Sequence, residues 1–97
     1  MAMKHYVLLK LAPSADVDAF AECMRETYRK LDEAMPQLHD PRVHKNCVVR
    51  DSNYDLMAEI ELDGAEFLQA YLTHPLHVAM AKGFSGVVIG RVSFDCE

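Results

Sequence analysis

The segment YLTHPLH, residues 71 to 77, concentrates side chains that can move protons. It holds Tyr71 and two histidines three residues apart, His74 and His77. Histidine changes charge near neutral pH and a phenol can donate to a developing oxyanion, so these residue types suit acid–base catalysis. Paired imidazoles also suit a metal ion. A third interpretation is structural, because the segment could simply end one helix and begin another.

Pro75 gives the two histidines different positions. A proline disfavours helical geometry in the preceding residue and suits the first position of a new helix. We therefore expect a break at His74, whose ring would accept a hydrogen bond from a free backbone N–H of the new helix. His77 falls near the third position of that helix. The helix dipole there disfavours the imidazolium, which predicts a lowered pKa for His77.

A distant histidine, His5, lies in the strand-like segment KHYVLLKL, residues 4 to 11. Its alternation with apolar residues places His5 on the strand face that covers the core. The structural interpretation of His5 is a core-edge residue bonded to a backbone carbonyl. Tyr71 lies on the apolar stripe of its expected helix, so by default it is a core residue with its hydroxyl at a cavity edge.

The catalytic hypothesis joins His5, Tyr71 and His77 in one cavity. His77 would abstract a proton from an acidic C–H, oriented by His5, while Tyr71 holds the oxyanion. For metal binding, the segment lacks the carboxylate of a zinc pattern such as HExxH, and the rings of His74 and His77 need not converge across the proline. We expect no metal and no cofactor.

The elements that must position these residues predict an α+β fold of the ferredoxin-like type, with the order β-α-β-β-α-(α)-β, a four-stranded antiparallel sheet and helices on one face. An apolar stripe predicts a helix from Val17 to about Ala34, capped by Ser14 or Asp16. Asp63 is expected to cap the next helix, with Glu66 completing a capping box. The expected strands are residues 4–11, 42–50, 54–62 and 90–96, and the later helices are 64–73 and one that starts at Pro75.

The second and third strands are expected to form a hairpin through the turn DSN, residues 51 to 53. On the sheet face away from the helices, Tyr6, Leu8 and Met57 are mixed with charged residues. A second copy of the chain packing sheet to sheet would cover this face. We therefore expect a homodimer.

Composition narrows the class of protein. The chain has 97 residues, enough for one domain over residues 1–97, and carries a formal charge of -5, which argues against a nucleic-acid partner. Three cysteines without a CxxC pair, Cys23, Cys47 and Cys96, favour reduced thiols and a cytoplasmic location. No apolar stretch approaches the length of a membrane span, so we expect no membrane partner.

Four segments follow one another along the chain: KHYVLLKL, NYDLMAEIEL, YLTHPLH and VSFD. Together they resemble the stress-responsive dimeric α/β-barrel (Dabb) family over nearly the whole chain. The resemblance implies a ferredoxin-like protomer whose sheet pairs with a partner's sheet into a barrel. A plant branch, the polyketide (olivetolic acid) cyclases, performs an intramolecular aldol condensation without a cofactor. The catalytic groups of that branch match His5, Tyr71 and His77.

Two departures from the plant branch bear on the ligand. The plant enzyme has a longer connection between strands two and three than RDSN, residues 50 to 53, and it has aromatic residues in its alkyl pocket. Here the corresponding stretch, FSGVVIGRVSF, has no Trp. Four methionines could line an adaptable pocket or fill a core, namely Met24, Met35, Met57 and Met80.

The expected function is binding of a small, largely apolar molecule between sheet and helices, with cofactor-independent lyase or cyclase chemistry as the catalytic hypothesis. The alternative is a non-catalytic, stress-induced binding or interaction protein. A lesser alternative is a haem-binding or monooxygenase-like barrel with His77 as the haem ligand, although the Trp of haem-degrading relatives is missing.

Overall fold

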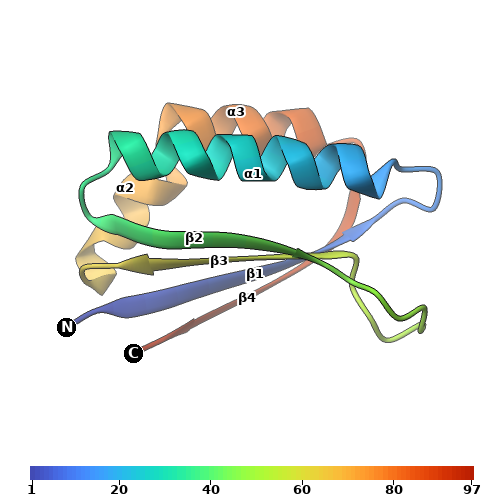
Figure 1. Cartoon of the computed structure of the whole chain (residues 1–97), viewed down its shortest axis with the longest axis horizontal. Helices are drawn as coiled ribbons and strands as arrows, with labels where there is room; N and C mark the ends of the chain where they lie inside the picture. Colours follow the sequence, from blue (N-terminus) through green and yellow to red (C-terminus); the bar gives the residue numbers. More distant parts are fainter.

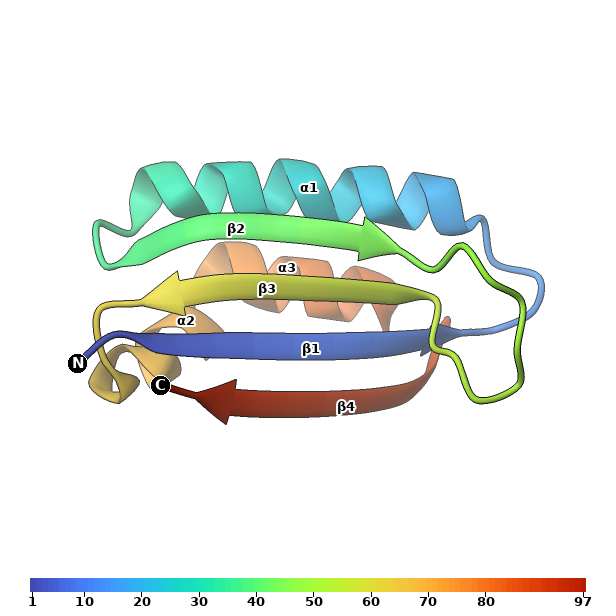
Figure 2. The same cartoon turned by 60° about the horizontal axis from the view of Figure 1, so that its bottom comes forward.

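In the computed structural model, which describes residues 1–97, four antiparallel strands form one sheet in the order β2-β3-β1-β4 (Figure 1). All helices lie on one side of the sheet, and the opposite face is uncovered (Figure 2). The order confirms the predicted ferredoxin-like fold. The elements are β1 (Met3–Leu11), α1 (Val17–Ala34), β2 (Leu38–Lys45), β3 (Leu56–Leu62), the 3₁₀ turn η1 (Ala65–Phe67), α2 (Leu68–Leu72), α3 (Pro75–Phe84) and β4 (Val88–Cys96).

Helix α1 has the predicted bounds because its signals are local. The Asp16 side chain accepts a hydrogen bond from the Ala19 N–H at 3.1 Å, so Asp16 rather than Ser14 is the N-cap. The stripe that faces the sheet is fully buried, and Pro36 follows the helix end. The buried residues of α1 are Ala21, Met24, Tyr28 and Leu31.

Alternation along β1 and β3 builds the floor of the core. On β3 every second residue is buried, from Leu56 to Leu62, and the residues between them are partly exposed on the other face. On β1 the buried positions include Leu9 and the polar His5. The core therefore lies between the sheet and the helices, and His5 belongs to its floor.

Strand β2 differs from the prediction of residues 42–50. It starts at Leu38, contains Pro41 and ends at Lys45, and its register shifts between His39 and Arg42. A proline is tolerated because β2 is an edge strand. The predicted antiparallel pairing of β2 with β3 is confirmed. The predicted short connection is wrong, because residues 46–55 form a loop in which Val49 is fully exposed.

The start of the second helical region also differs. Asp63 does not cap it, because its carboxylate bonds the His39 ring at 2.7 Å, and Gly64 at the N-cap has no side-chain bond. The segment instead begins as the turn η1, and α2 is short. β3 begins two residues later than predicted, which leaves Tyr54 outside the strand, and β4 begins two residues earlier.

The break and restart around Pro75 are as predicted. Pro75 occupies the first turn of α3, and the backbone N–H of Leu76 donates to His74 Nδ1 at 3.1 Å. His74 therefore has a structural role as the N-cap. None of the helices is long and apolar enough to cross a membrane.

Candidate active site

His5 on β1, Tyr71 on α2 and His77 on α3 line a single cavity of about 60 Å³. Tyr71 lies between the two imidazoles: its ring centroid is 5.6 Å from that of His5 and 4.7 Å from that of His77. The structure therefore brings the three predicted residues together. The rest of the wall is apolar on the side of the helices and β1, and polar on β4, where Arg91 and Ser93 line it.

The His5 ring is held by a carboxylate rather than by the predicted backbone carbonyl. Antiparallel pairing of β1 and β4 places His5 opposite Asp95, and His5 Nδ1 lies 2.5 Å from Asp95 Oδ1. An ionised carboxylate can only accept, so Nδ1 carries the proton. In the neutral ring this leaves Nε2 as a free lone pair with no protein partner.

The His77 ring is held in the same way by the end of α2. His77 Nδ1 donates to the Leu72 carbonyl at 3.0 Å, and no hydrogen bond joins the two imidazoles. The pKa of His77 is lowered, as predicted, but burial is the main cause rather than the helix dipole, and the charge of Arg91 lowers the pKa further. At neutral pH His77 is therefore uncharged, with its lone pair on Nε2.

Tyr71 shares a buried hydrogen bond with a second phenol. Its hydroxyl lies 2.6 Å from the Tyr28 hydroxyl of α1, and both side chains are almost fully buried. Burial raises the pKa of both phenols, so both keep their protons at neutral pH. When Tyr28 donates to Tyr71, the proton of Tyr71 remains available to a group in the cavity.

The grouping of side chains and the cavity volume argue against the metal and haem hypotheses. No three His, Cys, Asp or Glu side chains gather closely enough to hold a metal ion. The cavity of about 60 Å³ is far smaller than the roughly 300–1,000 Å³ typical of ligand pockets, and a haem does not fit it. The space suits a molecule of a few heavy atoms, or the reactive end of a larger one.

Four residues at the site were not singled out from the sequence, namely Tyr28, Arg91, Ser93 and Asp95. Asp95 lies in the segment VSFD, and alternation along that strand was the available signal, but its pairing with His5 depends on the register of β4 against β1. Tyr28 lies on the buried stripe of α1, and the available signal was that a buried tyrosine usually needs a polar partner. Met24 and Met80 line the cavity, whereas Met35 belongs to the core.

Comparisons with known proteins agree with this architecture. A dimeric protein of unknown function with a ferredoxin-like fold from Bacteroides fragilis is 24% identical, with a TM-score of 0.84 over 99% of this chain and 95% of that one. A dimeric ferredoxin-like protein of unknown function from Thermobifida fusca is 25% identical, with a TM-score of 0.81 over 99% and 90%. A hydroxynitrile lyase from Passiflora edulis is 12% identical, with a TM-score of 0.77 over 98% and 91%.

No curated protein matches the sequence significantly. The family model described as the stress responsive A/B barrel domain (Dabb) matches residues 3–97. That match spans nearly the whole chain and all four strands of the sheet. The chain therefore belongs to the stress-responsive α/β-barrel (Dabb) domain family.

Proposed function

We propose that this protein catalyses cofactor-independent proton abstraction from a small carbon acid, in the manner of an aldol-type lyase or cyclase. The observation that carries the proposal is the convergence of His5, Tyr71 and His77 on one cavity, with Nε2 of both histidines free of protein partners. Each group is also fixed by a neighbour, which is the preorganisation that such chemistry needs.

In the proposed reaction His77 Nε2 takes a proton from the carbon next to a carbonyl. The electron pair of the C–H bond moves onto the carbonyl oxygen, and the enolate formed accepts a hydrogen bond from the Tyr71 hydroxyl. The enolate carbon then attacks a second carbonyl, and the proton on His77 passes to the new alkoxide. His5, held by Asp95, lies at the same wall and orients the substrate.

The protein is proposed to act as a homodimer through the open face of its sheet. Two large apolar side chains of β4, Val92 and Phe94, are 48% and 63% exposed there, and they lie opposite Leu8 and Tyr6 in the register with β1. Structural neighbours of this fold are described as dimeric. The three free cysteines support the predicted cytoplasmic location.

A second candidate function is ligand binding without chemistry. The observation that favours it is that Nδ1 of each histidine and the Tyr71 hydroxyl already have protein partners, in a cavity of only about 60 Å³. In that case Asp95, the Leu72 carbonyl and Tyr28 serve only to satisfy these polar groups, and the protein binds a small molecule or a partner in response to stress.

Hydrogen–deuterium exchange at carbon separates the two functions. Levulinate and its methyl ester carry C–H groups next to a ketone that exchange slowly without a catalyst, and exchange in deuterated water is followed by proton NMR. The test variant is His77→Gln. The matched control is His74→Asn, which removes an imidazole from the same segment but keeps a side chain that caps α3.

We expect the native protein and His74→Asn to accelerate exchange, and His77→Gln to lose at least about 100-fold of the acceleration, the usual lower range for a general base. Equal exchange by the native protein and His77→Gln on both probes would reject the catalytic proposal and leave the binding function.

A further inference from the structure

Strand β4 has an inverted polarity. Residues paired across an antiparallel sheet share a face, and the β1 partners of alternate β4 residues face the helices. The helix-facing side of a strand is apolar where helices cover it. On the edge strand β4 this side is exposed to solvent from Arg91 to Asp95. On β4 the helix-facing residues are Arg91, Ser93 and Asp95, whereas Val92 and Phe94 point to the open face.

The three helix-facing polar residues differ in their contacts. Asp95 holds the His5 ring, and Ser93 lines the cavity. Arg91 lies opposite the core residue Leu9 and lines the same cavity, yet it forms no hydrogen bond or ion pair with the rest of the chain. By contrast, Arg29 on the surface of α1 is held by two glutamates.

The charge of Arg91 reaches the catalytic groups. It is exposed to solvent, so it stands where the cavity opens. Burial raises the pKa of Tyr28 and Tyr71, and the positive charge of Arg91 opposes that rise. Burial lowers the pKa of His77, and the charge of Arg91 lowers it further. Asp95, the only carboxylate on the same face of β4, bonds the His5 ring and forms no ion pair with Arg91. Arg91 is the only arginine or lysine that lines the cavity, and no carboxylate lines it.

We propose that the cavity is specific for small carboxylates, whose anionic group is held by Arg91 and the Ser93 hydroxyl while the carbon acid lies against Tyr71 and His77. A planar guanidinium can bind a carboxylate through two parallel hydrogen bonds, and one unpaired cation matches a single negative charge. The cavity's small volume places such a group at its mouth, beside Arg91. Arg91 is thus a specificity-determining residue.

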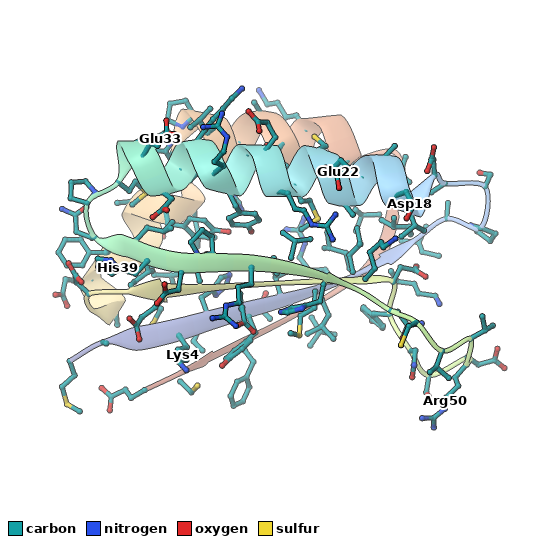
Figure 3. The ribbon with its side chains drawn as sticks, viewed as in Figure 1. Lys4, Asp18, Glu22, Glu33, His39 and Arg50 are labelled. Carbon is teal, nitrogen blue, oxygen red and sulfur yellow. The ribbon has the colours of Figure 1, made fainter.

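This inference rests on the proposed function of the same cavity and refines its ligand from a small carbon acid in general to one that carries a carboxylate. The simpler reading of Arg91 is a solvated surface arginine such as Arg50, which Figure 3 places in the loop between β2 and β3. Arg91 differs from Arg50 in two respects: it lies on the helix-facing side of β4, and it pairs with the core residue Leu9. Arg50→Gln is therefore a matched control, because it removes the same charge from the same residue type.

The test is an NMR titration of the native protein, Arg91→Gln, Arg91→Lys and Arg50→Gln with levulinate, and in parallel with methyl levulinate. We expect Arg91→Gln to weaken levulinate binding at least about tenfold, a loss expected for one charged contact, and Arg91→Lys to keep part of the affinity. Arg50→Gln should bind like the native protein. The neutral ester should bind weakly and equally to all four.

Equal levulinate affinity in Arg91→Gln and the native protein, an ester that binds as tightly as the acid, or no levulinate binding at millimolar concentration would each overturn the inference. The affinity for levulinate and the rate of carbon exchange are measured independently. Arg91-dependent binding without any carbon exchange would remove the catalytic proposal and keep the carboxylate site. His77-dependent exchange that is equally fast in Arg91→Gln would keep the catalytic proposal and remove the carboxylate site.

Discussion

The two faces of the sheet are made by the same strands but differ in what covers them. The face under the helices buries aliphatic residues around His5 and the phenol pair, and every fully buried side-chain nitrogen or oxygen has a partner. The open face carries Val92 and Phe94 in contact with solvent, flanked by charged residues of β1 and β3. The alternation of side chains along the strands therefore places a core on one side of the sheet and exposed apolar side chains on the other.

The difference shows that the candidate site and the proposed dimer interface lie on opposite faces of one sheet. Polar groups can be kept under the helices because each is bonded to another residue, and that arrangement holds the site. Val92 and Phe94 on the open face are the apolar groups that the proposed dimer interface would cover. β4 contributes to both, since its polar residues face the cavity and its apolar residues face outward.

The largest expected effect contrasts two leucines on opposite faces. Leu62 is fully buried under the helices, so Leu62→Ala should lower the free energy of unfolding by about 3 kcal/mol through lost packing. Leu8 faces the open side, so Leu8→Ala should act through the dimer and cost more at high than at low protein concentration. Urea denaturation at two protein concentrations measures both. Equal costs at every concentration would remove the distinction between the faces.

The next effect concerns the open face alone. Val92→Glu places a charge in the proposed interface and should raise the dimer dissociation constant by at least about 100-fold, because a buried unpaired charge costs several kcal/mol. Val49→Glu is the control, since Val49 is fully exposed in the loop. Sedimentation equilibrium compares them. A Val92→Glu protein as dimeric as the control would place the interface elsewhere.

A smaller effect probes the pairing of polar groups on the covered face. Tyr28→Phe leaves the buried Tyr71 hydroxyl without its partner and should cost about 1–2 kcal/mol of unfolding free energy. Removing both hydroxyls, with Tyr71→Phe added, should cost less than the sum of the single changes. Additive costs in denaturant unfolding would mean that the two phenols do not depend on one another.

The smallest effect is a pH dependence that originates in His77. Its pKa in the folded protein is below the ordinary value of 6.5. Between these two pKa values the unfolded chain binds a proton at His77 that the folded chain does not bind. Stability should therefore fall as pH drops from about 6.5 towards the lower folded pKa, and this loss should be absent in His77→Gln. Thermal unfolding across that range measures it, and an unchanged slope in the variant would contradict the assignment.

Local signals predicted one helix and one helix break correctly, but the local capping box of Asp63 and Glu66 did not form, and the bounds of an edge strand were not predicted. The bounds of α1 and the restart at Pro75 follow from caps, a stripe and a proline within a few residues. Strand β2 was placed too late because apolar residues such as Val48 favour a strand, while the actual strand is selected by its pairing with β3 around Pro41. Strand propensity depends on neighbours that the local sequence does not reveal.

The same limit applies to the site. Residue type and alternation were enough to single out His5, Tyr71 and His77. Their distances depend on how α2 and α3 pack over β1, and the bond from Asp95 to His5 depends on strand register. The polar lining of β4 was visible in the sequence as RVSFD, but its direction became clear only with the sheet.

The most direct test of the central claim is the nitrogen-15 NMR spectrum of the histidine ring nitrogens at neutral pH. Two histidines of one segment should show opposite tautomers. His74 Nδ1 accepts from the Leu76 N–H, so its proton lies on Nε2, whereas His77 Nδ1 donates to Leu72, which leaves Nε2 as the base. Neutral His77 with a bare Nε2 is the predicted result. A proton on His77 Nε2, or a charged ring, would contradict the account.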